Sequence, residues 1–173
     1  MAGEAVPAGA AGETRRMTAS DLEAMLYNKP GHLIRRLQQI AVTVFLEETA
    51  EFDVTPVQYA ALLAIRAHPG IDQLRLAHAI GFDRTTIGGV VERLEARGYI
   101  TRKTGDADRR TKRLMATGAG ARALDAMAAG SARAQRRMLE GLDRRERALF
   151  MDMLARLVRI NNDVSRAPVN APA

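Results

Sequence analysis

The chain has 173 residues, about the length of one domain with a substantial hydrophobic core. Aromatic residues make up only 4% and helix-favouring residue types dominate, so the composition predicts a mainly helical fold. The net charge of +6 suits a polyanionic partner, and the absence of cysteine excludes disulfides, zinc–thiolate sites and thiol redox sensing.

The two ends of the chain are rich in small residues and proline. The N-terminal sequence MAGEAVPAGAAGETRR has an early acidic residue and no apolar core, so it does not resemble a secretory signal. No apolar run approaches the about 20 residues that a membrane helix needs. We therefore expect a cytoplasmic protein with no membrane partner, a disordered tail over residues 1–17 and a flexible tail over residues 164–173.

Capping signals predict helices in the N-terminal part. Ser20 followed by Glu23 fits a capping box that opens a short helix. A long helix then runs from about Pro30 to Glu51, and its apolar residues cover an arc of roughly 140°, wider than one packing surface requires. We expect this helix to pack both on its own domain and on a partner subunit, so residues 18–54 are assigned as N-terminal dimerisation helices.

A helix-turn-helix follows. Thr55, with proline after it and glutamine three residues on, opens a helix that ends before His68, and Ile71 has room for a very short strand. Asp72 then caps a helix that runs to Ile80, and another helix occupies residues 84–97. Because only three residues separate these two short helices, they predict a helix-turn-helix.

A β-hairpin and two further helices complete the chain. Residues 99–103 and 112–116 flank a polar loop and predict a wing, so residues 55–116 form a winged helix-turn-helix domain. Thr117 caps a helix to about Leu139, and an Asp-x-x-Glu capping box at Asp143 opens the last helix. The fold class is mainly α with a small β-wing, and residues 117–163 are the C-terminal dimerisation helices.

Positive charge is concentrated around this wing. The segment from Arg97 to Arg113 contains seven basic and two acidic residues, as proteins that bind nucleic acid tend to show. For an arbitrary charge run a solvated hairpin is the simpler interpretation. Here the run follows a helix-turn-helix, where a wing reaches the adjacent minor groove. We therefore expect Arg109, Arg110 and Lys112 to contact double-stranded DNA.

The helix at residues 84–97 is the predicted recognition helix. Its apolar residues follow i, i+3, i+4, i+7 spacing and predict a buried face, and the opposite face is free to enter a major groove. Adjacent Gly88 and Gly89 cost roughly 1 kcal/mol each relative to alanine, so they indicate either close approach to DNA or close packing on a neighbouring helix. The candidate DNA contacts on this face are Arg84, Thr85, Thr86, Gly88, Gly89 and Arg93.

Three motifs follow the predicted helix-turn-helix: GYITRK, the wing tip Asp108-Arg109-Arg110 and the strand-to-helix sequence LMATGAG. Together with the helix-turn-helix, they resemble the MarR (multiple antibiotic resistance regulator) family over about residues 30–162. Ala107 stands where proline is usual and Ala116 where leucine is usual. The resemblance implies a homodimer with interlocking first and last long helices on a pseudo-palindromic operator. It also implies that Arg110 enters the minor groove and that Asp108 orients the wing arginines.

Two segments look like one branch of that family, the repressors of nicotinate-degradation genes. They are MLYNKPGHLIRRLQQIAV and GFDRTTIGGVVERLEARG. The resemblance implies a repressor of an aromatic-compound catabolic pathway that is released by a small aromatic carboxylate, with a hydroxynicotinate as the specific case.

An effector site is implied by the same resemblance. His32, Arg36 and Thr43 lie at one edge of the apolar arc of the helix at residues 30–51, where Arg36 could pair with a carboxylate. His32 could meet a ring heteroatom, and Tyr59 could stack on the ligand. The alternative for each is structural, with Arg36 and His32 on the surface or in dimer salt bridges and Tyr59 in the core.

Other functions have little support in the sequence. The three histidines share no helical spacing, and no hydrolase, metalloprotease or nucleotide-binding motif occurs, so we expect neither catalysis nor a metal or other cofactor. Two alternatives to a sequence-specific regulator stay open. One is a winged-helix module that docks a protein, and the other is a non-specific nucleoid-type DNA-binding protein.

Overall fold

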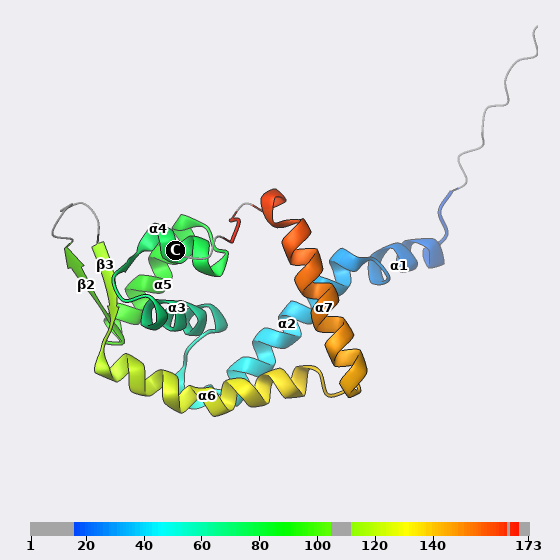
Figure 1. Cartoon of the computed structure of the whole chain (residues 1–173). Coiled ribbons are helices and arrows are strands. Elements are labelled where there is room, and N and C mark those ends of the chain that lie inside the picture. The colour runs from blue at the N-terminus through cyan, green and yellow to red at the C-terminus, as the bar shows by residue number, and fades with distance from the viewer. Residues whose placement is uncertain (1–15, 105–111, 166, 170–173) are drawn as a thin grey trace, which may run out of the picture. The chain divides into compact units, whose positions relative to one another are not determined.

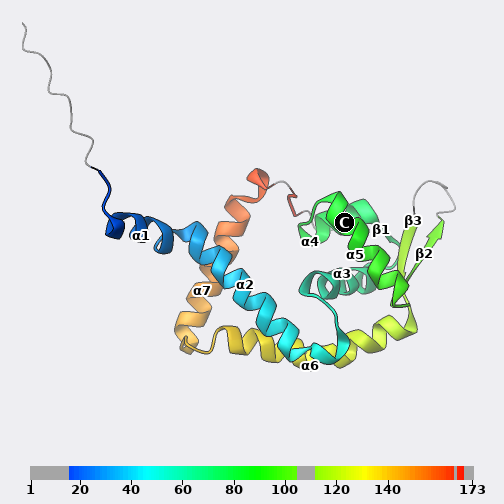
Figure 2. The ribbon, with the colours of Figure 1, turned by 180° about the vertical axis from the view of Figure 1, so that it is seen from behind.

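The computed structural model describes residues 16–104, 112–165 and 167–169. The chain forms two compact units, residues 1–38 and residues 39–173, and each is described by itself. Figures 1 and 2 show the ribbon from opposite sides. None of the helices in the described ranges is long and apolar enough to cross a membrane.

The first unit contains α1 (Ala19–Tyr27) and the beginning of α2 (Pro30–Glu48). The predicted cap at Ser20 is wrong by two residues, because Thr18 is the N-cap. The Thr18 hydroxyl accepts a hydrogen bond from the Asp21 N–H at 3.1 Å, and the Asp21 carboxylate accepts one from the Thr18 N–H at 2.9 Å. Thr18 and Ser20 are each followed three residues later by an acidic residue, and the first of these two pairs forms the capping box. No residue of α1 is buried.

In the second unit, α2 ends three residues earlier than predicted. The buried Thr49 hydroxyl donates to the Phe45 carbonyl at 2.7 Å, and a 3₁₀ turn, η1 (Ala50–Phe52), follows. Asp53 then adopts a left-handed conformation with φ 47°. The chain turns here into α3 (Pro56–Ala67), whose predicted capping box between Thr55 and Gln58 is confirmed.

The helix-turn-helix and its predicted cap Asp72 are confirmed. It consists of α4 (Gln73–Ile80) and α5 (Arg84–Ala96), and Gly81 takes φ 69° at the turn. The helices α3, α4 and α5 pack on one another around one apolar core, as Figures 1 and 2 both show. The largest fully buried apolar side chains of this core are Leu62, Ile65, Leu76, Ile87, Leu94, Ile100, Leu114 and Met127.

The wing belongs to a three-stranded antiparallel sheet of order β1-β3-β2. The strands are β1 (Ile71–Asp72), β2 (Ile100–Thr104) and β3 (Lys112–Ala116). The predicted hairpin is confirmed, with β2 starting one residue later than expected. Tyr99 precedes the strand because its N–H donates to the Leu94 carbonyl at 3.0 Å and its carbonyl accepts from Thr117 at 2.9 Å. The pairing of β1 with β3 was not predicted.

Two long helices complete the unit, α6 (Gly118–Met138) and α7 (Arg144–Ile160), followed by η2 (Asn162–Val164). The predicted caps Thr117 and Asp143 are both confirmed. At the start of α6 the Thr117 hydroxyl also donates to the Gly98 carbonyl at 2.6 Å. Hydrogen bonds at Thr117 therefore connect three places in the fold: the end of α5, the start of β2 and the start of α6.

Glycine permits two close approaches along α6. A Cβ on Gly120 would overlap the backbone carbonyl of Tyr99, and a Cβ on Gly130 would overlap the carbonyl oxygen of Glu48. The end of α2 therefore crosses α6 at backbone contact distance. In contrast, no residue of α7 is buried in the described chain.

Candidate nucleic-acid interface and effector site

The recognition helix α5 divides into the two predicted faces. Ile87, Val90, Val91 and Leu94 are at most 2% exposed, so the core face is confirmed. On the other side Thr85, Thr86, Glu92 and Arg93 are exposed, and Arg84 is the first helical residue. The helix therefore presents a polar surface of the kind that enters a major groove.

The N-terminus of α5 is held by Asp83. Its Oδ1 accepts from the N–H groups of Thr85 and Thr86 at 3.0 and 2.9 Å, and its Oδ2 accepts from the Thr86 hydroxyl at 2.6 Å. These bonds, the Thr86 hydroxyl first, hold the pKa of the Asp83 carboxyl below its usual value. Thr86 therefore already uses its hydroxyl proton, whereas the Thr85 hydroxyl makes no hydrogen bond within the described chain.

The glycine pair on α5 is not explained by packing within the chain. A Cβ on Gly89 would have nothing within 4 Å among the described residues, and one on Gly88 would meet only the Gln73 amide at 3.5 Å. The Gln73 contact is at ordinary van der Waals distance. The packing alternative is therefore wrong within the described chain, and the open space lies on the exposed side of the recognition helix.

One ion pair and one hydrogen bond hold the base of the wing in place. The Arg102 guanidinium on β2 pairs with Glu95 on α5, with Nε to Oε2 at 2.7 Å, and this bond lowers the pKa of the Glu95 carboxyl. Arg113 on β3 donates to the Gly70 carbonyl at 3.1 Å. Lys112 is exposed at the start of β3. The predicted wing-tip residues Asp108, Arg109 and Arg110 lie outside the described residues.

A basic depression beside the sheet was missed in the sequence. Its volume is about 320 Å³ and its lining includes His68, Gly70, Arg75 and Arg113. The Arg75 backbone N–H is capped by Asp72 at 2.9 Å, and its side chain is exposed. The unpredicted pairing of β1 with β3 places Arg113 opposite Asp72. Arg75, three residues after the Asp72 cap of α4, was the available signal in the sequence.

The four candidate effector residues fall in different places. In the first unit the His32 ring makes an edge contact with Tyr27 at 5.5 Å between centroids, and Arg36 is exposed on the same helix one turn later. In the second unit the Thr43 hydroxyl donates to the Gln39 carbonyl at 3.1 Å. The half-buried Tyr59 ring lies 5.4 Å from that of Phe45 and packs against the core.

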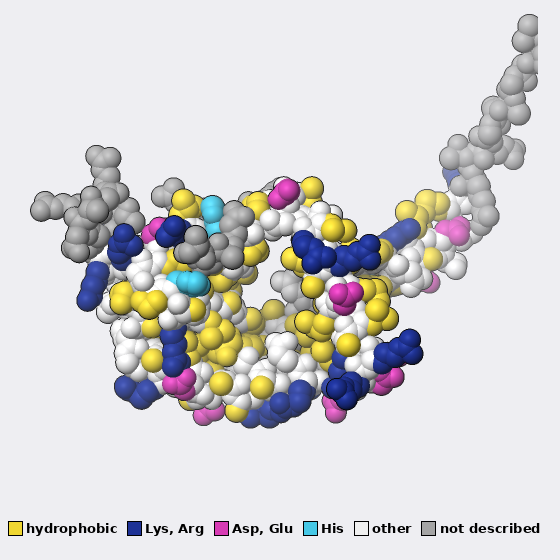
Figure 3. All heavy atoms as spheres, in the orientation of Figure 1, with side chains coloured by type: hydrophobic (Ala, Val, Ile, Leu, Met, Phe, Trp, Pro, Cys, Tyr) yellow, Lys and Arg dark blue, Asp and Glu magenta, His cyan; other side chains and the backbone are white. Residues whose placement is uncertain are grey.

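Basic side chains recur on the surface that Figure 3 displays, over the sheet end of the second unit and where α6 meets α7.

Among the described residues no group of three His, Cys, Asp or Glu side chains could hold a metal ion.

A family model described as MarR family matches residues 52–111, the segment with the helix-turn-helix. The transcriptional repressor NicR of Pseudomonas putida is 30% identical over 128 residues, which cover 74% of this chain and 81% of NicR. The chain belongs to the MarR family. This MarR-family chain is therefore a transcriptional regulator with a winged helix-turn-helix.

Two solved structures of MarR-type regulators are similar to this chain. The repressor CouR bound to a 23-mer DNA duplex is 31% identical, with a TM-score of 0.71 and coverage of 77% of this chain and 94% of CouR. BpsR of Bordetella bronchiseptica, whose DNA binding is regulated by 6-hydroxynicotinic acid, is 27% identical. Its TM-score is 0.71, and the match covers 76% of this chain and 94% of BpsR.

Proposed function

We propose that this protein is a homodimeric repressor that binds a pseudo-palindromic operator and is released by a small aromatic carboxylate. The observation that carries the DNA-binding part is the exposed face of α5. It combines exposed Thr85 and Arg93 with a Gly88–Gly89 pair that no neighbouring atom of the described chain requires. A groove-facing helix with two side-chain-free positions fits close approach to a DNA backbone or base edge.

The remaining DNA contacts come from further residues of α5 and from basic residues around the sheet. Arg84, Thr86 and Gly88 extend the α5 surface, and Lys112 with Arg109 belongs to the wing. We assign Arg110 to the minor groove and Asp108 to orienting the arginines. Arg75 and Arg113, which line the basic depression, are suited to contacting phosphates beside the wing.

Homodimerisation is supported by the apolar surface of the terminal helices. Six large apolar residues of α7 are about half exposed or more: Leu149, Met151, Met153, Leu157, Val158 and Ile160. Leu22, Met25, Leu26 and Tyr27 on α1 and Leu33 and Ile34 on α2 are similarly exposed. Exposed apolar surface of this extent marks an interaction site. In a two-fold dimer the same patches from both copies would cover one another.

The effector is assigned by chemistry and by relatives. BpsR supports a hydroxynicotinate-like ligand, since its DNA binding is regulated by 6-hydroxynicotinic acid. Arg36 is suited to pairing with the carboxylate and His32 to the ring substituent, with Thr43 and Tyr59 as further candidates. A ligand that prefers one dimer geometry would move the two recognition helices away from half-sites about 34 Å apart, and operator affinity would fall.

A gel shift with the DNA upstream of the protein's own gene tests the DNA-binding proposal. Sequence-specific, salt-sensitive binding is expected of the regulator, and Arg110→Ala should weaken it while leaving the dimer intact. Binding without operator preference would favour a nucleoid-type protein. No binding at all would favour a protein-docking module. Unchanged affinity of Arg110→Ala across a salt titration would refute the wing assignment.

Thermal-shift screening of aromatic acids, including hydroxynicotinates, tests the effector. A ligand that binds the native state raises the melting temperature by mass action. Arg36→Ala should abolish ligand-induced release but preserve operator binding. If release by the ligand is unchanged in this variant, Arg36 does not belong to the site.

A further inference from the structure

A second polar pocket lies where α6 ends and α7 begins. Its volume is about 420 Å³, and its lining residues are Glu48, Arg133, Arg136, Arg137, Glu140 and Arg147. The lining has four arginines and two glutamates, and Glu47 pairs with one of these arginines from outside the lining, so one positive charge remains in excess. None of these residues belongs to the DNA-binding or effector surfaces assigned above.

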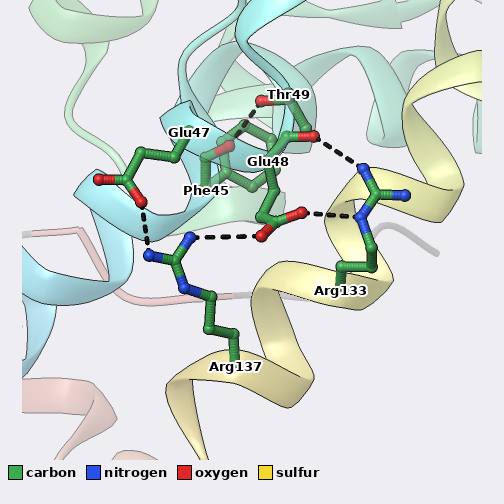
Figure 4. A network of polar contacts seen from close by, with 6 residues as sticks. All are labelled: Phe45, Glu47, Glu48, Thr49, Arg133 and Arg137. Atoms are coloured by element: carbon green, nitrogen blue, oxygen red, sulfur yellow. Dashed lines mark hydrogen bonds and ion pairs between the residues drawn. The ribbon is translucent and has the colours of Figure 1, made fainter.

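Glu48 holds two of the arginines in place. As Figure 4 shows, its carboxylate lies between Arg133 and Arg137, at 2.7 Å from the Arg133 Nε and 3.3 Å from the Arg137 Nη1. Arg137 also pairs with Glu47 at 2.7 Å. The Arg133 bond first, and then Arg137, lowers the pKa of the Glu48 carboxyl, whose side chain is only 20% exposed. These pairs fix the guanidinium groups in one orientation around the pocket.

The other two arginines retain donors for a ligand. The Arg136 side chain makes no hydrogen bond or ion pair with any residue in the described part of the chain. Arg147 donates only its Nε, to the Leu142 carbonyl at 2.8 Å, so its two terminal nitrogens remain available. Guanidinium groups with free, planar pairs of N–H donors match the oxygen atoms of phosphate groups.

We propose that this pocket binds the pyrophosphate group of a small phosphate-bearing molecule. Two anchored guanidinium groups beside two that keep free terminal donors favour a doubly phosphorylated group, which has more acceptor oxygens than a single carboxylate. The carboxylate of Glu140, which has no partner among the described residues, opposes the ligand and sets its affinity. The site lies at the end of α6 opposite to the sheet. A 21-residue helix spans about 30 Å, so the pocket is separate from the DNA-reading surface.

Isothermal titration calorimetry of the full-length protein at low ionic strength, with inorganic pyrophosphate and orthophosphate as probes, tests this site. Pyrophosphate should bind saturably and at least about tenfold more tightly than orthophosphate. Arg136→Gln and Arg147→Gln should each weaken pyrophosphate binding by about tenfold, and Glu140→Gln should strengthen it severalfold. Arg145→Gln is the matched control, because Arg145 is exposed on α7 outside the lining, and it should leave binding unchanged.

Opposite effects of the arginine and glutamate variants would support a binding site, since a purely structural cluster would not produce them. Absence of saturable binding, or an equal loss in Arg145→Gln, would overturn the proposal. Two further measurements identify other occupants. If duplex DNA displaces pyrophosphate, the pocket is a DNA contact, and if Arg136→Gln changes the sedimentation of the oligomer, it is a subunit contact. Either outcome overturns the proposal.

Discussion

At the scale of single residues, Gly89 is a position where the stability of the fold favours alanine and the proposed DNA binding favours glycine. A glycine in the interior of a helix stabilises the folded protein less than alanine does, because the glycine backbone loses more conformational freedom on folding. A methyl group at position 89 would have no atom of the described residues within 4 Å. No contact within the described chain therefore requires glycine there, and DNA is the occupant that the proposed function supplies.

Gly89→Ala should stabilise the protein and weaken operator binding. The expected gain is about 0.5–1 kcal/mol in the free energy of unfolding, measured by urea denaturation. Fluorescence anisotropy with operator DNA should show a loss of affinity of about tenfold. Gly31→Ala is the control and should leave operator affinity unchanged, because Gly31 is a helical glycine whose Cβ would also have no described residue within 4 Å. Unchanged DNA affinity in Gly89→Ala would remove Gly89 from the interface.

Gly130 has the opposite requirement, because the α2 backbone leaves no room for a side chain there. Gly130→Ala should lower the free energy of unfolding by about 1–3 kcal/mol, since the new methyl would overlap the Glu48 carbonyl and the two helices would have to separate. Urea denaturation measures this. Gly141→Ala, where the added methyl would have no atom of the described part of the chain within 4 Å, should change the free energy of unfolding by less than about 0.5 kcal/mol. Equal effects of the two substitutions would contradict the close crossing.

At the scale of elements, the start of most helices could be predicted from local capping residues. Features that depend on contacts between distant parts of the chain could not be predicted in this way. The caps Thr55, Asp72, Thr117 and Asp143 each bond within three residues, so the sequence contains all that they need. The site divides in the same way. The buried and exposed faces of α5 follow from periodicity, whereas the basic depression depends on pairing between β1 and β3, which are about 40 residues apart. The periodicity of apolar residues within one element does not indicate which distant strand will pair with it.

The cap of α5 gives a prediction with a defined pH dependence. Asp83→Ala should lower the urea midpoint and weaken operator binding, because the first turn of the recognition helix loses three hydrogen-bond acceptor contacts. Asp83→Asn should retain most of the stability at acidic pH. If both variants match the wild type near neutral pH, the cap does not stabilise the helix.

The sign of the pH effect follows from the lowered pKa of Asp83. A carboxyl with a lowered pKa in the folded state stabilises the protein above its usual pKa, near 3.8, and this contribution is lost as pH falls through the lower folded value. The urea midpoint of the wild type should therefore exceed that of Asp83→Asn by a constant amount from neutral pH down to about 4. The difference should narrow below that pH.

At the scale of the whole molecule, the exposed apolar side chains of α7 form the surface that the proposed dimer would cover. Leu157→Glu should weaken dimerisation by at least about tenfold in sedimentation experiments, because burying an unpaired carboxylate is unfavourable. Operator affinity should fall with it. Arg159→Glu introduces the same side chain on the polar side of α7 and should leave the dimer intact. Equal sedimentation of both variants and the wild type would place the subunit interface elsewhere.

The bonds at Thr117 have a mechanical consequence for such a dimer. Thr117 joins the start of α6 to the end of α5 through Gly98 and to the wing through Tyr99, so these parts must turn together. A rigid arm about 30 Å long that tilts by about 10° moves its tip by about 5 Å. A small rotation at the far end of α6 would thus be amplified into a displacement of the proposed DNA-binding surface that is comparable to the rise of one helical turn.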